Sequence, residues 1–291
     1  MIALNNQRGI VAMSVGMVCF LMNDSLVKHV SESLPAPQLI FLRGLLATLG
    51  LFVLALALRQ LPAWRETVGH IGHKWVFIRS FLDGLASLVY LSALFNMPLA
   101  NATAINMSTP LLIALLSALL LQHRISWRHW LIIGLGFGGV LCVVQPQADG
   151  FNHWAWVALA GTLCHALRDL SVHFIPDHVP SPLITLSTAL TATVMAGIWA
   201  LFHPWHSVTP MQWAQMAGAS VFLSAGYLLL IKATRIADMT VIAPFRYMGL
   251  LTAVVMGFVV WGDVPNALAW TGMGLLVAAG LMMIRISRPP P

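Results

Sequence analysis

Ten long apolar runs follow one another along this chain and restrict what it can fold into. A helix needs about 20 predominantly apolar residues to cross the hydrocarbon core of a bilayer, and each run is close to that length. Strands are excluded, because the runs are too long and only helices or closed barrels satisfy their backbone hydrogen bonds in lipid. We predict an all-α polytopic membrane protein with transmembrane helices at residues 9–30, 36–58, 74–96, 99–121, 127–144, 152–174, 181–202, 211–233, 238–261 and 267–286.

Composition indicates the same class. Of the 291 residues, 59% are hydrophobic and only 8% are charged, whereas soluble domains carry about 25% charged residues. These values exclude an ordinary cytosolic enzyme, a disordered protein and a disulfide-stapled secreted module. Ten spans use about 200 residues and leave about 90 for loops and ends, so no room remains for an additional soluble domain.

The basic residues alternate between the predicted loops. One set of loops holds ten of the 15 Lys and Arg residues, and the opposite set holds only Lys28. The positive-inside rule therefore predicts a protein of the cytoplasmic (inner) membrane with both termini in the cytoplasm. The formal net charge of +6 does not indicate nucleic-acid binding, because the basic residues form no stripe. The remaining four lie inside predicted spans: Arg43, Arg79, Arg168 and Arg246.

The two halves of the sequence resemble each other. A shift of 145 residues places Asp24 on Asp169, and a shift of 137 places Tyr90 on Tyr227. We predict two five-helix repeats, residues 1–146 and 147–291. Because each repeat has an odd number of spans, the second must lie inverted in the membrane. Inverted repeats are typical of secondary transporters, whose substrate site lies near the midplane between them.

Two segments resemble a known family. The segment from Tyr90 to Asn106, followed by Pro110, resembles the third-to-fourth helix signature of the drug/metabolite transporter superfamily. Ala243-Pro-Phe-Arg-Tyr247 and Trp261-Gly-Asp-Val-Pro265 resemble the ninth helix of its ten-helix EamA-type exporters. The resemblance covers essentially the whole chain and implies an exporter of amino acids or similar small metabolites. The aromatic and neutral amino-acid exporters are the most similar group.

The chain departs from the family pattern at three places. The fourth and ninth helices of the family often end in Leu-Gly-Glu, and here those Glu positions are His123 and Asp263. In the second repeat, Tyr247 stands opposite Pro110, and the proline of that helix is Pro244. The family fold tolerates such changes. The superfamily carries many substrates, so the resemblance fixes the substrate class less firmly than the fold.

Glycines and histidines form patterns that have simpler explanations than a cofactor. Gly134 to Gly139 satisfies the dinucleotide pattern G-x-G-x-x-G, but no strand precedes it. Small residues that let helices approach closely explain it better, and a homodimer through the fifth and tenth helices is one expected use. His70/His73 and His203/His206 have metal-like spacing without carboxylate or thiolate support. We therefore predict no cofactor and no metal.

Polar residues inside the third and eighth spans predict a substrate cavity. Arg79 and Asp83 are one helical turn apart and are expected to pair, and Ser87 and Tyr90 continue that face. Their repeat mates on the eighth span have the same spacing. The alternative is a purely structural pair with hydroxyls that bond their own backbone. The predicted substrate-binding residues are Asp83, Ser87, Tyr90, Asn106, Thr109, Ser224, Tyr227 and Arg246.

Other intramembrane charges are candidates for gating or proton transfer, because such charges are costly and usually functional. Asp24 is expected to reach Lys28, and Asp169 adjoins Arg168. Arg246 has no local acidic partner, which makes it the first candidate for an anion site. The predicted gating or proton residues are Asp24, Asp169, Arg79 and Arg43.

These features predict a secondary transporter that exports amino acids or related small metabolites by alternating access. One alternative is an uptake permease or antiporter of a sugar, nucleotide-sugar or drug on the same fold. Another is an intramembrane enzyme, which should carry paired catalytic residues at a membrane interface. The sequence contains none of the nucleophile or zinc motifs such an enzyme would use. The expected partners are a small-molecule substrate and the lipid bilayer.

Overall fold

The computed structural model describes residues 2–57, 73–120, 127–145, 153–171, 174–176, 179, 181–237 and 239–286. Over these residues the chain forms helices and turns and no strand, which confirms the predicted all-α class. The longer helices are α1 (Ile2–Ser31), α2 (Ala36–Ala57), α4 (Lys74–Phe95), α7 (Trp127–Val144), α8 (Trp154–Ser171), α9 (Ser181–Ala200), α10 (Pro210–Ile236) and α13 (Ala267–Ile286).

Two of the ten predicted spans are interrupted helices. The fourth consists of α5 (Leu99–Asn106) and α6 (Thr109–Leu120), separated by a turn before Pro110. Proline lacks an N–H and cannot continue the hydrogen-bond pattern of a preceding helix. The ninth consists of α11 (Met239–Ile242), a 3-10 segment η2 (Ala243–Tyr247), α12 (Met248–Met256) and a π-helical turn η3 (Gly257–Trp261). Pro244 lies in the first turn of η2 and explains the change of helix type there.

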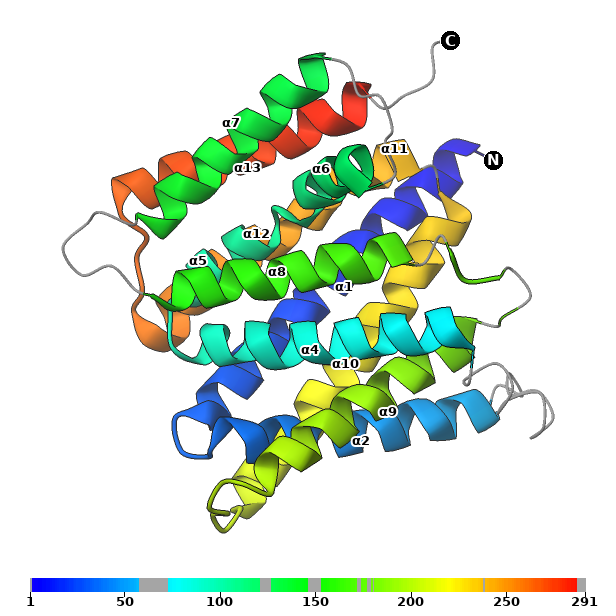
Figure 1. Ribbon diagram of the computed structural model, residues 1–291, viewed down its shortest axis with the longest axis vertical. Helices are drawn as coiled ribbons and strands as arrows, with labels where there is room; N and C mark the ends of the chain where they lie inside the picture. The colour runs from blue at the N-terminus through cyan, green and yellow to red at the C-terminus, as the bar shows by residue number, and fades with distance from the viewer. Residues whose placement is uncertain are drawn as a thin grey trace.

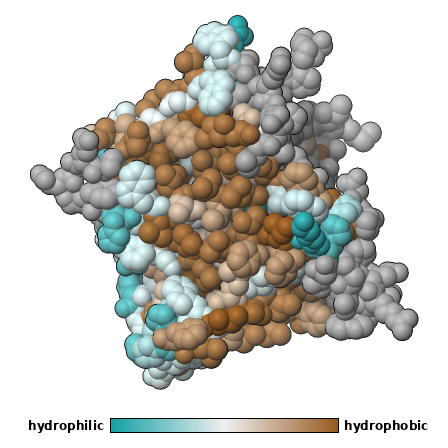
Figure 2. Space-filling model, in the orientation of Figure 1, coloured by the Kyte–Doolittle hydropathy of each residue, from teal (hydrophilic) through white to brown (hydrophobic). Residues whose placement is uncertain are grey.

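Length and composition allow several of these helices to cross a bilayer. Seven helices in the described residues are apolar and at least 18 residues long, and two shorter apolar helices cover Phe245–Trp261 and Ala267–Met283. Large apolar side chains such as Val11, Leu131 and Val221 are exposed. Apolar side chains dominate the face in Figure 2, and polar ones lie toward its edges. This distribution is that of a polytopic membrane protein.

The main helix contacts join the first half of the chain to the second. Helix α1 packs against α10, and α4 packs against α8 and α9. Helix α2 lies between α9 and α10, while α7 and α13 form a separate pair at one side (Figure 1). The predicted repeat mates are α1 and α8, α2 and α9, and α4 and α10. Replacing each helix by its mate turns the contact between α1 and α10 into one between α8 and α4. It likewise turns the contact between α2 and α10 into one between α9 and α4. Both resulting contacts occur among the described helices.

The α7–α13 pair uses glycines for close contact. A Cβ atom on Gly139 would lie 2.8 Å from the carbonyl oxygen of Gly272, and one on Gly272 would lie 2.5 Å from the carbonyl oxygen of Gly139. The glycines of the fifth and tenth spans thus pack on each other within the chain. Gly134, Gly138 and Gly274 have no such neighbour, so an interface with another molecule would have to use their side of the pair.

The helix ends gather at two opposite sides of the molecule. In Figure 1 the N-terminal end of α1, the C-terminal ends of α2 and α13, and the N-terminal end of α4 lie toward the upper and right edges. The α1–α2 turn and the α4–α5 turn lie at the opposite side. This alternation is what a chain that crosses a membrane repeatedly requires, and it places both described chain ends on the same side.

Candidate functional site

A buried ion pair joins α4 to α8. Asp83 is the tenth of the 22 residues of α4, and its residue surface is only 6% exposed. Its carboxylate accepts a hydrogen bond from the Arg168 guanidinium. Arg168 also donates from Nε to Oδ1 of Asp169 at 2.9 Å. One arginine therefore serves two carboxylates, which satisfies charges that would be costly to bury alone.

The predicted local pair between Arg79 and Asp83 is wrong. Arg79 donates from Nη1 to Oγ1 of Thr188 on α9 at 3.0 Å, and Asp83 is occupied by Arg168. The neighbouring Ser80 also contacts α9, through a 3.0 Å hydrogen bond with Ser187. The polar face of α4 is therefore divided between α8 and α9. The Nε atom of Arg79 is buried and has no hydrogen-bond partner in the described residues.

A second polar group joins α1 to α2. Arg43 donates from Nη1 to Oδ1 of Asn23 at 3.2 Å, and Asn23 donates to Asp24 at 2.8 Å. Arg43 interacts electrostatically with Asp24, and its buried Nε has no hydrogen-bond partner in the residues described here. The expected contact between Asp24 and Lys28 is wrong. Lys28 instead donates to the carbonyl oxygens of Leu94 and Met97 at 2.8 and 2.6 Å.

The two tyrosines predicted as repeat mates face these charges. Tyr227 on α10 interacts electrostatically with Asp83 and with three arginines, Arg168, Arg79 and Arg43. Its ring packs edge-on against Phe20, with 5.1 Å between the ring centroids. Tyr90 on α4 interacts electrostatically with Asp24, and its ring centroid lies 5.8 Å from that of His165. Tyr90 is also part of the main hydrophobic core, so it borders the charged groups from the apolar side.

These contacts define one central charge cluster, contributed by α1, α2, α4 and α8 together with Tyr227 of α10. Its charged members are Asp24, Arg43, Arg79, Asp83, Arg168 and Asp169. Three carboxylates thus face three guanidinium groups. The Asp83 side chain is 8% exposed, whereas those of Arg168 and Asp169 are 19% and 32% exposed. Arg168 and Asp169 are therefore partly exposed, whereas Asp83 is buried in the helix bundle.

The other predicted substrate-binding residues lie in different surroundings. Asn106 contacts Nδ1 of His165 at 3.1 Å, which connects the broken fourth span to α8. Thr109 at the start of α6 donates to the backbone carbonyl of Asn106 at the end of α5 at 2.6 Å, and Ser224 donates to the carbonyl of Ser220 in its own helix at 2.9 Å. Ser87 is half-buried. Arg246 lies in η2 and is not joined to the cluster by any hydrogen bond or ion pair within the described ranges.

The family can be decided by comparison with known proteins. The sequence model of the EamA-like transporter family matches this chain twice, over residues 7–145 and 152–285. The chain belongs to the EamA-like transporter family. This confirms the resemblance to the drug/metabolite transporter superfamily, since the match extends over nearly all of the sequence.

Curated relatives of this EamA-like transporter carry different substrates. It is 26% identical over 275 residues to a pseudopaline exporter of Pseudomonas aeruginosa, which covers 92% of this chain and 93% of that protein. It is 25% identical to an S-adenosylmethionine uptake transporter of Rickettsia bellii, over 90% and 88% of the two chains. A riboflavin transporter of Vibrio cholerae is 25% identical, over 70% and 68%. These relatives thus include both an exporter and an uptake transporter.

A solved crystal structure of another protein has the same fold. The TM-score is 0.60, and the match covers 96% of this chain and 99% of the other at 17% sequence identity. At that identity the likeness extends to the fold of the EamA-like transporter, and the site must be argued from its own residues.

In the described residues of this EamA-like transporter, no three His, Cys, Asp or Glu side chains lie close enough together to hold a metal ion. His203 contacts the carbonyl oxygen of Trp199 at 3.1 Å, and His206 bonds Gln38 through its backbone. His70, of the other predicted pair, lies outside the described residues, as does His123.

Sequence reasoning missed three members of the site. The sequence shows Arg168 as a charge inside a predicted span but does not show that its partner is Asp83. A charge inside a span is the feature that selected Arg43 and Arg79, and it applies equally to Arg168. His165 lies one turn before Asp169 on α8, so its position on the polar face could have been found from spacing. Thr188 carried no signal, because a threonine in an apolar span has no local feature that reveals a distant partner.

Proposed function

We propose that this protein is a secondary transporter that exports amino acids or related small metabolites across the cytoplasmic membrane by alternating access. The observation that carries the proposal is the central charge cluster, in a family whose members named above are transporters. An amino acid brings a carboxylate and an ammonium group into a low-dielectric interior, and both need partners there. The cluster offers guanidinium groups and carboxylates at one place.

The arginines of the cluster differ in how many of their N–H donors already have an acceptor. Arg168 is shared by two carboxylates. Arg43 and Arg79 each keep a buried Nε without a hydrogen-bond partner in the described chain. A substrate carboxylate supplies the missing acceptor in a charge-assisted hydrogen bond. We therefore assign the carboxylate to Arg43 and Arg79, beside Tyr227, and the ammonium group to Asp24. Arg246, the first candidate from sequence, becomes a second anion site outside the cluster.

Two further parts of the proposal concern architecture. Residues 1–146 and 147–291 act as two five-helix repeats that lie inverted to each other, in support of which the helix contacts exchange in pairs. Both termini lie in the cytoplasm, because the loops on that side carry nearly all the loop arginines and lysines. Two repeats that exchange conformations give outward-open and inward-open states of similar energy.

A second function is uptake or antiport of another metabolite class on the same fold. The observation that favours it is the relationship to S-adenosylmethionine uptake transporters and riboflavin transporters. The arginines of the cluster would suit a larger anionic or zwitterionic molecule equally well. An intramembrane enzyme has less support, since the relatives named above are transporters.

Flux measurements separate these functions. The full-length protein is reconstituted into liposomes, and uptake and efflux are measured over a panel of amino acids, S-adenosylmethionine and riboflavin, with and without a proton gradient. We expect saturable flux of one or more amino acids above that of protein-free liposomes. Flux of riboflavin or S-adenosylmethionine alone selects the second function, and absence of flux for every compound contradicts the proposal for this panel.

A further inference from the structure

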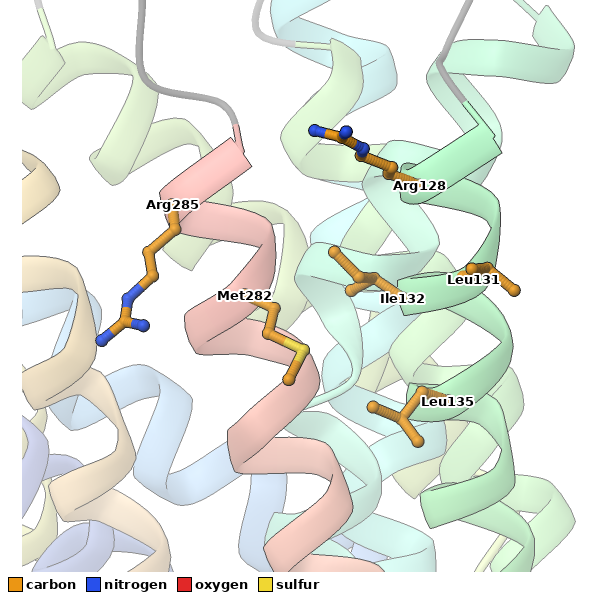
Figure 3. A pocket seen from close by; sticks show the side chains of 6 residues that line it. All are labelled: Arg128, Leu131, Ile132, Leu135, Met282 and Arg285. Carbon is orange, nitrogen blue, oxygen red and sulfur yellow. The ribbon is translucent and has the colours of Figure 1, made fainter.

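A groove of about 540 Å³ lies on the outside of the α7–α13 pair, where α7 begins and α13 ends (Figure 3). It is separate from the central charge cluster. Four apolar residues and two arginines line it: Leu131, Ile132, Leu135, Met282, Arg128 and Arg285. The volume is within the range of sites that hold small organic ligands, roughly 300–1,000 Å³.

The groove is apolar along the helices and basic at its end. Leu131 and Met282 are exposed, so this part faces the surroundings of the protein. Figure 3 shows Arg128 extending from α7 toward α13 above the apolar side chains, and Arg285 on α13 one turn beyond Met282, with its guanidinium group turned away from α7. Trp127 is 67% exposed beside Arg128, and exposed tryptophans are typical of the level where lipid headgroups meet the hydrocarbon core.

The two arginines have no carboxylate partner in the described residues. The sequence around them adds basic residues and no acidic ones: residues 121–126 include Arg124, and residues 287–291 include Arg288. In the described part of the chain both guanidinium groups are therefore available to an anion from outside. Guanidinium groups match phosphate oxygens with paired hydrogen bonds.

We propose that this groove binds one anionic phospholipid. Its phosphate contacts Arg128, and the exposed Arg285 side chain reaches the same phosphate by rotating toward α7. Its acyl chain covers Leu131, Leu135 and Met282. Basic pockets between transmembrane helices on the cytoplasmic side are suited to anionic headgroups. The site lies in the inner leaflet if the proposed orientation holds, and it does not depend on which substrate the protein carries.

A second copy of the chain fits this groove less well. A symmetric dimer brings the same patch of each copy together, so the arginines of both would face one another. Like charges across an interface with no acidic residue between them are unfavourable. A lipid supplies the negative charge and the apolar surface in one molecule.

The test compares lipid binding by matched variants of the purified full-length protein in neutral detergent. Native mass spectrometry counts bound dioleoyl phosphatidylglycerol and dioleoyl phosphatidylcholine during a titration. The double variant Arg128→Gln/Arg285→Gln removes the proposed contacts. The control variant Arg8→Gln/Lys232→Gln removes two exposed basic residues at the same end of the bundle. We expect the dissociation constant of the first phosphatidylglycerol to rise roughly thirty-fold in the first variant, equivalent to about 2 kcal/mol, and to change little in the control.

A third variant keeps both arginines and fills the groove. Leu135→Trp should also weaken binding of phosphatidylglycerol, and glycerol phosphate, which lacks acyl chains, should bind much more weakly than the lipid. Equal weakening in the two double variants would show that only surface charge matters and would overturn the proposal. Equal binding of glycerol phosphate and lipid would also overturn the proposal. So would the loss of a dimer in Arg128→Gln/Arg285→Gln while lipid binding stays unchanged.

Discussion

At the scale of single residues, the interior is organised by which charge meets which partner. Asp83 and Arg168 come from different helices, and the Asp83 side chain is only 8% exposed. Removing Arg168 leaves the buried Asp83 carboxylate uncompensated, which costs about 3–5 kcal/mol, whereas removing Asp83 leaves Arg168 its second partner, Asp169. The pair is therefore coupled in stability, independently of any role in transport.

Arg168→Gln should lower the thermal unfolding temperature of the purified protein by more than the double variant Asp83→Asn/Arg168→Gln does. Asp83→Asn alone should lower it less, because Arg168 keeps its contact with Asp169. The control is Arg8→Gln, at an exposed charged residue of α1, which should have little effect. Strictly additive effects of the two single substitutions would mean that the pair contributes no coupling energy and that the contact is incidental.

At the scale of helices, the spans could be read from sequence and the contacts between them could not. The predicted span 36–58 corresponds to α2 at Ala36–Ala57, and 127–144 coincides with α7 at Trp127–Val144. Apolar length and flanking polar residues determine these limits locally. The partner of Asp83 depends on how α4 faces α8 and α9, which no local pattern encodes. Arg79 one turn away was the reasonable local choice, and it was wrong for that reason.

The α7–α13 contact predicts unequal effects of two neighbouring glycines. Gly139→Ala places a Cβ atom 2.8 Å from a carbonyl oxygen of α13, so the helices must separate. Gly138→Ala meets nothing within 4 Å, and alanine favours a helix by about 1 kcal/mol over glycine. We expect Gly139→Ala to lower the thermal unfolding temperature and Gly138→Ala to leave it unchanged or raise it. Equal destabilisation by both would contradict the close packing of the pair.

Lys28 holds three elements together at the end of the molecule opposite the chain termini. Its ammonium group donates to the carbonyl oxygens of Leu94 and Met97 and lies 5.5 Å from the ring of Trp261. Trp261 in turn donates to Glu32 of α1 at 2.6 Å. The side chain thus connects α1 to the α4–α5 turn and to η3.

Lys28→Met removes both hydrogen bonds, so two carbonyl oxygens lose the ammonium donor. Each group left unsatisfied lowers the free energy of unfolding by about 1–3 kcal/mol. The purified variant should unfold at a lower temperature than wild type, while Lys232→Met, at an exposed position of α10, should not. A Lys28→Met protein as stable as wild type would remove Lys28 from the set of residues that hold these elements.

At the scale of the whole molecule, the account depends on the proposed orientation. Single cysteines at Arg8 and at Ser33, in a background without Cys19, Cys142 and Cys164, should react differently with a membrane-impermeant thiol reagent in intact cells. We expect labelling at the Ser33 position only, with the Arg8 position labelled after the membrane is opened. The reverse pattern would contradict the proposed orientation and, with it, the inferred direction of export.

The central claim is that substrate binds at the central charge cluster, and flux through matched arginine variants tests it most directly. Wild type, Arg79→Gln, Arg43→Gln and Arg246→Gln are reconstituted into liposomes at equal, folded amounts, and efflux of the best-transported carboxylate substrate is measured. Loss of a charge-assisted hydrogen bond should reduce flux about tenfold or more in Arg79→Gln and Arg43→Gln, with a smaller loss in Arg246→Gln. Wild-type flux in both cluster variants, with flux abolished only in Arg246→Gln, would contradict the claim.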